Sequence, residues 1–251
     1  MKTWIPLISL LFFGIIHAKA QHTDAQASSH SQSSTVPALI PFKHHNKVGF
    51  KNLQGEIIIY PSYDFAGAFH EGFAIVGING KRGFINTLGK EVIPCQYEDL
   101  SDFSQGLAVA ALHGKYGYIN TSNQWVAQPI FDKAFKHHEG LARVQRQGKY
   151  GYINMQGEIV IPTIYHDAGD FHQQRAIIAI DALYGFINTN GQQVVEPQYM
   201  AAMDYTAHGV AKVMKHHEPY TLYLIDTAGH TISQEQHFDE RREMLNKLKK
   251  Q

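Results

Sequence analysis

The chain lacks several features that would narrow its class. It has one cysteine, Cys95, in 251 residues, so no disulfide within the chain can stabilise the fold and packing must do so. It has no charge imbalance, with 22 basic and 22 acidic side chains, and its Lys and Arg residues are scattered. A protein that binds nucleic acid needs a clustered basic face, so we expect no nucleic-acid partner. After the first 20 residues, no apolar run is long enough to cross a membrane.

Residues 1–20 have the pattern of a secretory signal peptide. Lys2 precedes an apolar run over residues 4–16, and a small-x-small site at residues 18–20 comes before Gln21. We therefore expect cleavage after residue 20 and export to a periplasm or to the extracellular space. Cleavage would leave 20 basic and 22 acidic side chains and no integral membrane segment. Because lipid attachment at the cleavage point requires a cysteine where Gln21 stands, no lipid anchor is expected.

The segments that flank the middle of the chain differ in composition from it. Residues 21–35 are almost entirely Gln, Ser, His, Ala and Thr, too poor in apolar side chains to fold, and are predicted to be a disordered linker. At the other end, Ser233 and Gln236 resemble a helix-capping pair, and an apolar stripe follows on a charged segment. This predicts a short C-terminal helical tail over residues 233–251 that covers the open end of the domain.

Between these segments, over residues 36–232, a short signature recurs at a spacing of 34 residues. It reads Gly, then Phe or Tyr, then Ile and Asn. Its complete copies begin at Gly83, Gly117, Gly151 and Gly185, an abbreviated copy is Gly49-Phe50, and a degenerate sixth copy ends at Asp226. A unit copied at fixed spacing builds an extended surface, and such surfaces usually serve binding.

The unit reads as three antiparallel strands. In the clearest copy, Leu141–Arg146 alternates with period two, which predicts a buried face and a solvent-exposed face that carries Arg143 and Gln145. A glycine-containing hairpin turn leads to the signature strand. A third strand, Glu158–Ile161, is predicted to stop at Pro162, because proline cannot donate to a ladder.

The remaining regular positions predict structural roles. Asn154 and Gly157 have the spacing of the first and last residues of a tight turn, and Asn86 with Gly89 repeats it. One aromatic residue follows each signature glycine at a fixed distance and a second follows four of the five, and we interpret them as core residues that anchor the connecting segment. They occur in the series Tyr63, Tyr97, Phe131, Tyr165 and Tyr199, and in the series Phe69, Phe103, Phe171 and Tyr205.

The composition decides between architectures that share this period. Helical tetratricopeptide repeats also have 34 residues, but the glycines, prolines, β-branched and aromatic residues of each unit exclude them. We therefore predict an all-β fold of tandem antiparallel three-stranded repeats in a solenoid-like array. A closed β-propeller is the alternative, disfavoured because propeller blades usually have four strands and about 40 or more residues.

No chemistry is predicted for the chain. Adjacent histidines on a strand point to opposite faces, so the three Lys-His-His triplets, which begin at Lys43, Lys136 and Lys215, do not predict a metal site. The acidic residues of the connecting segments, such as Asp99 and Asp167, are interpreted as caps of short helical turns. Neither a nucleophile motif nor a phosphate-binding glycine loop occurs. We therefore expect no catalytic residue, no metal and no cofactor.

Several motifs resemble the WG-repeat family of bacteria over about residues 36–232. They are Lys149-Tyr150-Gly151-Tyr152-Ile153-Asn154, Glu91-Val92-Ile93-Pro94, Tyr63-Asp64 and Phe69-His70-Glu71-Gly72-Phe73-Ala74. The resemblance implies a β-rich repeat scaffold, often exported and inferred to mediate contacts. The chain departs from the family at its hallmark tryptophan, replaced by Val48, Arg82, Tyr116, Tyr150 and Tyr184.

These patterns lead to a functional hypothesis. We expect an exported, non-enzymatic repeat scaffold that binds a protein or a cell-envelope component. Positions that vary between the repeats give a hypothetical binding surface: Arg143, Gln145, Lys212 and Met214. A carbohydrate-binding or enzymatic envelope protein that uses grooves between repeats, and a purely structural spacer, are the alternatives.

Overall fold

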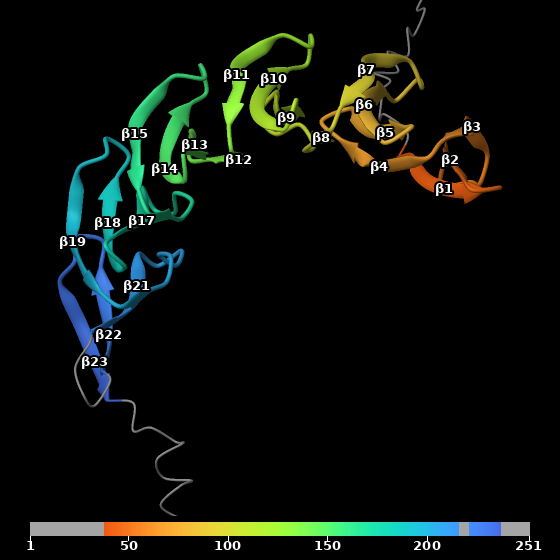
Figure 1. The fold of residues 1–251 in the computed structure, drawn as a ribbon. Helices are drawn as coiled ribbons and strands as arrows, with labels where there is room; N and C mark the ends of the chain where they lie inside the picture. Colours follow the sequence, from red (N-terminus) through yellow and green to blue (C-terminus); the bar gives the residue numbers. More distant parts are fainter. Residues whose placement is uncertain (1–37, 216–220, 237–251) are drawn as a thin grey trace, which may run out of the picture. The chain divides into compact units, whose positions relative to one another are not determined.

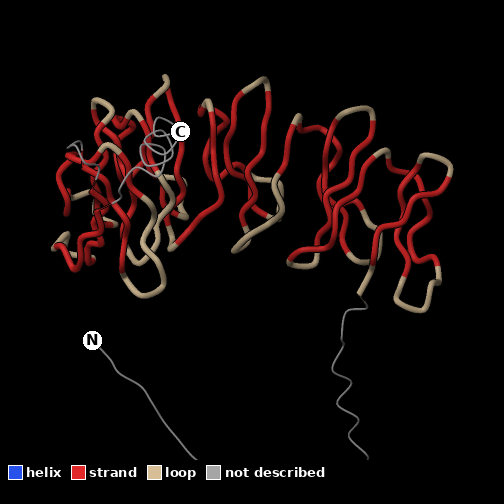
Figure 2. Tube along the Cα trace, turned by 90° about the horizontal axis from the view of Figure 1, so that it is seen from below, coloured by secondary structure: helices blue, strands red, loops and turns tan. Residues whose placement is uncertain are grey.

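The computed structural model describes residues 38–215 and 221–236, and these consist of strands and turns without a helix (Figures 1 and 2). The strands form six small antiparallel sheets that follow one another along the chain. The all-β, tandem-repeat prediction is thereby confirmed. The predicted signal peptide and linker lie outside the described residues, as do residues 237–251 of the predicted tail. Residues 233–236, where a helix was expected to begin, instead belong to the last strand.

Each sheet is a meander in which consecutive strands pair, and we number the sheets 1 to 6 in chain order. Sheet 1 comprises β1 (Ile40–His44), β2 (Lys47–Lys51) and β3 (Ile57–Tyr63). Sheet 2 comprises β4 (Phe65–His70), β5 (Phe73–Ile78), β6 (Lys81–Asn86) and β7 (Glu91–Tyr97). Sheet 3 comprises β8 (Asp99–Leu100), β9 (Leu107–Leu112), β10 (Lys115–Asn120) and β11 (Trp125–Phe131).

Sheets 4 to 6 repeat the pattern. Sheet 4 comprises β12 (Lys133–His138), β13 (Leu141–Arg146), β14 (Lys149–Asn154) and β15 (Ile159–Tyr165). Sheet 5 comprises β16 (Asp167–Ala168), β17 (Arg175–Ile180), β18 (Leu183–Asn188) and β19 (Gln193–Tyr199). Sheet 6 comprises β20 (Ala201–Ala202), β21 (Val210–Lys215), β22 (Thr221–Asp226) and β23 (Thr231–Gln236).

The prediction of three strands per unit was wrong for sheets 2 to 6, which have four. The additional strand lies in the segment that was interpreted as a connection with helical turns. In sheet 3 it is only Asp99 and Leu100, which pair with Ala111 and Ala110. So short a strand has no alternation that a sequence pattern could reveal. The four-strand count also removes one of the two arguments against a propeller.

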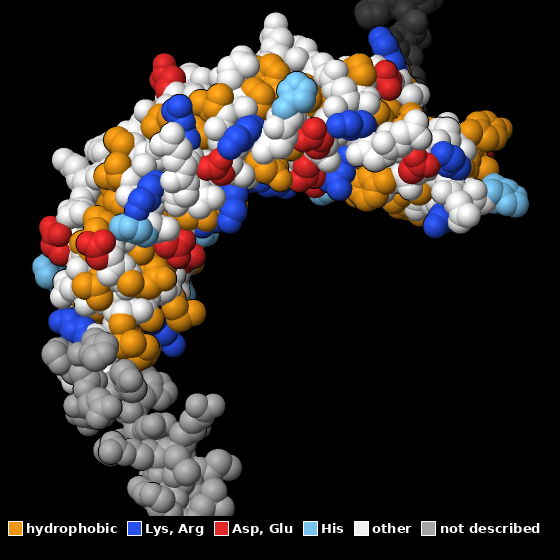
Figure 3. Space-filling model, in the orientation of Figure 1, with side chains coloured by type: hydrophobic (Ala, Val, Ile, Leu, Met, Phe, Trp, Pro, Cys, Tyr) orange, Lys and Arg blue, Asp and Glu red, His pale blue; other side chains and the backbone are white. Residues whose placement is uncertain are grey.

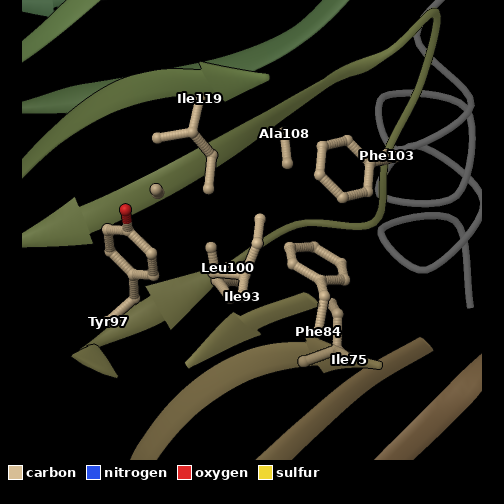
Figure 4. Packing of buried hydrophobic residues seen from close by; sticks show 9 residues of the cluster. Ile75, Phe84, Ile93, Tyr97, Leu100, Phe103, Ala108 and Ile119 are labelled. Carbon is tan, nitrogen blue, oxygen red and sulfur yellow. The ribbon is translucent and has the colours of Figure 1, made fainter. Parts of the chain in front are cut away.

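In sheets 2 to 5 the third strand supplies side chains to two different junctions. In β10, Tyr118 packs with Ala142, Val144 and Ile153 of sheet 4, whereas its neighbour Ile119 packs with residues of sheet 2. Figure 4 shows the second of these clusters, where side chains of sheets 2 and 3 point toward one another. Its labelled members are Ile75, Phe84, Ile93, Tyr97, Leu100, Phe103, Ala108 and Ile119.

Five such clusters join the six sheets pairwise in chain order, and among the described residues none joins sheet 1 to sheet 6. The prediction of a single buried face was therefore wrong. In β9 the residues Leu107 to Ala111 are all buried, because a neighbouring sheet covers each face. Exposed backbone and side chains are thus concentrated at the turns and at the first and last strands of each sheet.

The interpretation of the regularly spaced aromatics as core residues is confirmed. The second aromatic of each sheet packs on the signature aromatic of the preceding sheet, with ring centroids 4.4 Å apart for Phe103 on Phe84 and 4.8 Å apart for Phe171 on Tyr152. His137 occupies the equivalent place in sheet 4, buried to 6% exposure and 5.1 Å from the Tyr118 ring. Its Nε2 donates to the Asn154 carbonyl at 3.2 Å.

The signature glycine and the proline of the last strand are two parts of one feature. The last strand does not end at Pro162, as predicted, but continues to Tyr165 through a bulge, since Tyr150 pairs with Tyr165 and Tyr152 with Ile161. The bulged backbone crosses directly over Gly151, where a Cβ would lie 2.5 Å from the Ile161 oxygen and 2.7 Å from the Pro162 carbonyl. The last strand is an edge strand, where a proline is tolerated.

The turns follow the predictions. Asn79 and Gly80, at the two-residue turn of sheet 2, have φ of 51° and 73°, as hairpin turns of this length require. Asn154 Oδ1 accepts the backbone N–H groups of Gln156 and Glu158, both at 3.0 Å, and the Gly157 N–H reaches the Asn154 carbonyl at 3.0 Å. The signature asparagine is therefore a turn residue.

Replacing Gly151 by alanine tests the bulge. The substitution Gly151→Ala should lower the free energy of unfolding by about 1–3 kcal/mol, because the added methyl meets backbone that cannot move aside easily. The matched control is Gly67→Ala, whose methyl would have no neighbour closer than 4.0 Å. Urea unfolding of the processed chain measures both. Equal effects of the two substitutions would refute the close-approach explanation.

Burial of His137 makes stability depend on pH. Desolvation lowers the pKa of His137 below its ordinary value, although its hydrogen bond to Asn154 acts in the opposite direction. The unfolded state therefore binds the proton first, so the contribution of His137 is complete above about pH 6.5 and is lost as the pH falls through the lower folded-state pKa.

The expected result is that His137→Phe loses less stability than the unsubstituted chain between about pH 7.5 and 5.5. Phenylalanine occupies this place in other sheets, so the variant should fold. Urea unfolding at several pH values measures the slope, and His208→Gln, which alters an exposed histidine, is the control. A slope unchanged by His137→Phe would contradict the assignment.

Candidate functional site

Neighbouring sheets cover both faces of the inner strands, so most of the side chains there are apolar. A charged side chain on an inner strand is therefore a candidate for a functional role. The position opposite the signature aromatic is Ile75 in β5, Val109 in β9 and Ile177 in β17. In β13 it is Arg143, and in β21 of the degenerate last copy it is Lys212, which lies opposite Leu224 in place of an aromatic. Sheets 4 and 6 thus depart from the shared apolar pattern at the same structural position.

Arg143 is held from several sides. A guanidinium N–H donates to the Ala168 carbonyl of β16, and Nε lies 3.4 Å from Asp170 Oδ1. The guanidinium carbon lies 3.9 Å from the centre of the Phe135 ring. The side chain is only 18% exposed. Its charge is therefore offset by Asp170, and its orientation is fixed by contacts with sheets 4 and 5.

Histidines and aspartates alternate beside Arg143 across successive sheets. His138 Nε2 lies 3.8 Å from Asp170 Oδ2, and His172 Nε2 lies 3.9 Å from Asp204 Oδ2. An earlier copy of the pair joins His70 to Asp102 at 3.8 Å. Burial raises the pKa of Asp204, with Asp170 adding to the rise while His172 and Arg143 oppose it.

These groups do not converge as metal ligands. Among residues 38–215 and 221–236, no three His, Cys, Asp or Glu side chains are placed to hold a metal ion. Of the Lys-His-His triplets, His137 lies in the core and His138 pairs with Asp170. The triplet that begins at Lys215 lies mostly outside the described residues.

A pocket of about 360 Å³ lies beside this cluster, between the first strands of sheets 5 and 6. Arg143 borders it from sheet 4. Its apolar wall consists of Ile177, Tyr184 and Met200, and its carboxylates are Asp167 and Asp204. The Asp204 carboxylate reaches across to sheet 5, so close that a Cβ on Gly169 would lie 3.0 Å from its Oδ1. The remaining lining residues are Ala168, Gly169, Ala201 and Ala202.

A second depression, of about 610 Å³, lies among the turns near Glu139. Both carboxylate oxygens of Glu139 are engaged, since they accept the backbone N–H groups of Gln173 at 2.9 Å and Gln174 at 2.7 Å. Glu71 makes the same pair of bonds to the turn 34 residues later in the chain. Glu139 is therefore a link between sheets, and the Arg143 pocket is the better candidate for a binding site.

The structure separates the four residues of the hypothetical binding surface. Arg143 borders the pocket, and Met214, half-buried, is the cross-strand partner of the lining residue Ala201. Gln145 is half-buried and donates to the Gly148 carbonyl at 3.4 Å, and Lys212 is exposed. Neither of these two lines the pocket.

Sequence reasoning missed Asp204, Tyr184 and Met200 as pocket residues. One signal could have found Asp204: it shares its phase of the 34-residue period with Asp102 and Asp170. The face of the molecule in Figure 3 shows Lys, Arg, Asp and Glu side chains interspersed with apolar ones, with no region of one sign. The described residues include no helix of membrane-spanning length and hydrophobicity.

Comparison with solved structures finds similarity in chain path at low sequence identity. A eukaryotic initiation factor aligns with a TM-score of 0.48 and 9% identity over 78% of this chain and 62% of its own. Hsv2p of Kluyveromyces lactis gives 0.43 and 10% over 75% and 71%. BamB of Moraxella catarrhalis gives 0.42 and 12% over 80% and 70%. These values say nothing about what this chain binds.

The family comparison is specific. None of the curated proteins compared matches the chain. The model of the WG containing repeat, by contrast, matches five times in succession, over residues 49–81, 83–116, 116–150, 150–183 and 184–216. These matches cover more than half of the chain and follow the repeat period seen in the sheets. The chain therefore belongs to the family of proteins built from WG-containing repeats.

Proposed function

We propose that this chain is an exported, non-enzymatic scaffold that binds a protein or a cell-envelope component. The observation that carries the proposal is the contrast between constant and variable positions in one fold. The signature glycine, the signature aromatic and the turn asparagine recur in every complete copy and are used for packing and turns. The position opposite the signature residue varies by contrast, because Arg143 and Lys212 stand where other copies have an apolar residue, and the sheets keep the same pairing.

The chemistry of the described surface supports binding instead of turnover. The acidic and basic groups around the Arg143 pocket pair with one another or with backbone groups, and no activated nucleophile lies beside a base there. The regularly spaced aromatics, which could have formed a stacking platform for sugars, are largely buried in the junctions between sheets. A protein surface is thus a more suitable partner than a glycan.

Two finer features belong to the same proposal. Export rests on the signal-peptide pattern of residues 1–20. An open, solenoid-like array is favoured over a closed propeller because, among the described residues, the core clusters join only consecutive sheets. An open array leaves the faces and edges of its end sheets available to partners.

The experiment uses the processed chain, purified from the periplasm of a bacterial host, as bait for cross-linking to envelope extracts. We expect an N-terminus at Gln21 and one stoichiometric partner. Replacing Arg143, Gln145, Lys212 and Met214 by alanine should weaken its capture about tenfold or more, as loss of contacts worth about 1–2 kcal/mol predicts.

The matched control replaces Gln128 and Gln198 by alanine, since both are exposed on the last strands of sheets 3 and 5. Circular dichroism verifies that both variants fold. An unprocessed chain that stays in the cytoplasm would contradict export. Capture unaffected by the fourfold variant would contradict the binding surface, and binding to a glycan array in place of a protein would favour the carbohydrate alternative.

A further inference from the structure

The walls of the Arg143 pocket suit an aliphatic chain. Ile177 and Tyr184 lie on the central strands of sheet 5, and Met200 approaches from the start of sheet 6. All three are half-buried, so each presents part of an apolar surface to the pocket. Apolar walls with a few fixed polar groups are the usual composition of a ligand site.

The polar groups of the pocket leave an excess of negative charge. Arg143 is engaged with the Ala168 carbonyl and offset by Asp170, so its positive charge is not free to receive an anion. The carboxylates of Asp167 and Asp204 are therefore the negative charges of the pocket that Arg143 does not offset. Asp167 Oδ1 accepts the Ala168 N–H at 2.9 Å, and Asp204 has only the imidazole of His172 at 3.9 Å among its ion-pair partners in the described residues.

We propose that this pocket receives the side chain of a lysine or arginine from a partner polypeptide. The aliphatic stem of such a side chain packs on Ile177, Tyr184 and Met200, and its cationic head lies between Asp167 and Asp204. Long basic side chains combine these two requirements. The inference rests on the proposed binding function and deepens it by naming the chemistry of the partner.

A polypeptide fits better than a free amine for two reasons. The pocket volume of about 360 Å³ exceeds what one basic side chain fills, which leaves room for flanking residues. The pocket also adjoins β16 and β20, the first strands of sheets 5 and 6, and each is an edge strand of its sheet. An extended peptide segment can run along such edges.

The test measures binding of short peptides to the processed full-length chain by NMR titration. The probes are blocked tripeptides of glycine with a central Lys, Arg or Gln, and n-butylamine as a free amine. The expected result is that the Lys and Arg peptides bind severalfold to about tenfold more tightly than the Gln peptide, as two partly exposed ion pairs of up to about 1 kcal/mol each predict. High salt should weaken the difference.

Two double variants locate the effect. Asp167→Asn with Asp204→Asn should reduce binding of the Lys and Arg peptides about tenfold, because it removes both carboxylates at nearly constant shape. Asp132→Asn with Glu158→Gln removes the same charge away from the pocket and should leave binding unchanged. Equal binding of the Gln peptide, or equal losses in both double variants, would overturn the proposal. Butylamine binding as tight as the Lys peptide would overturn the choice of a polypeptide.

The same variants separate this inference from the proposed function. If the double variant at Asp167 and Asp204 still captures the envelope partner normally, the pocket inference fails while the scaffold function stands. If the basic peptides bind the pocket but no envelope partner is captured, the proposed scaffold function fails instead.

Discussion

The structure depends on contacts between the signature aromatic of one sheet and the second aromatic of the next. Inner strands such as β9 are apolar on both faces, so an isolated sheet would leave both of these faces exposed to water. Packing Phe103 on Phe84, or Phe171 on Tyr152, buries the facing surfaces of two sheets at once. Stability is therefore shared by neighbours, as expected of repeat proteins.

A second constraint, the close approach of backbone over the signature glycine, gives the sheets their common geometry. The bulged last strand crosses Gly151 at a distance that no side chain permits, and all five signature glycines meet the same kind of backbone. The proline lies in this bulge on an edge strand. Glycine and proline, which usually weaken strands, are here parts of one recurring feature.

The sequence predicted those features that are local or strictly periodic. The 34-residue spacing, the hairpin turns and the turn role of Asn154 follow from residue type and position, and the family resemblance came from the same motifs. The additional strand has only two residues in sheets 3, 5 and 6, which carry no alternation. In sheets 2 and 4 it has six residues, but a register shift interrupts its pairing and breaks the alternation. The sequence did not predict that both faces of β13 are buried, because the charged Arg143 in its alternating pattern indicated a solvent-exposed face. In the structure sheet 5 covers this side chain. The pocket joins residues of three sheets, which no local pattern reveals.

The scaffold and the candidate site are thus separable: the periodic packing residues hold the sheets together, and Arg143, which departs from the shared apolar pattern, provides distinctive chemistry beside Asp170 and Asp204. The most direct test of shared stability is hydrogen exchange of the processed chain carrying Phe171→Ala, a substitution of a residue at the junction of sheets 4 and 5. We predict that amides of β14 and β17 lose protection together, while those of sheet 2 keep it. Loss confined to sheet 5, with β14 unchanged, would contradict the account.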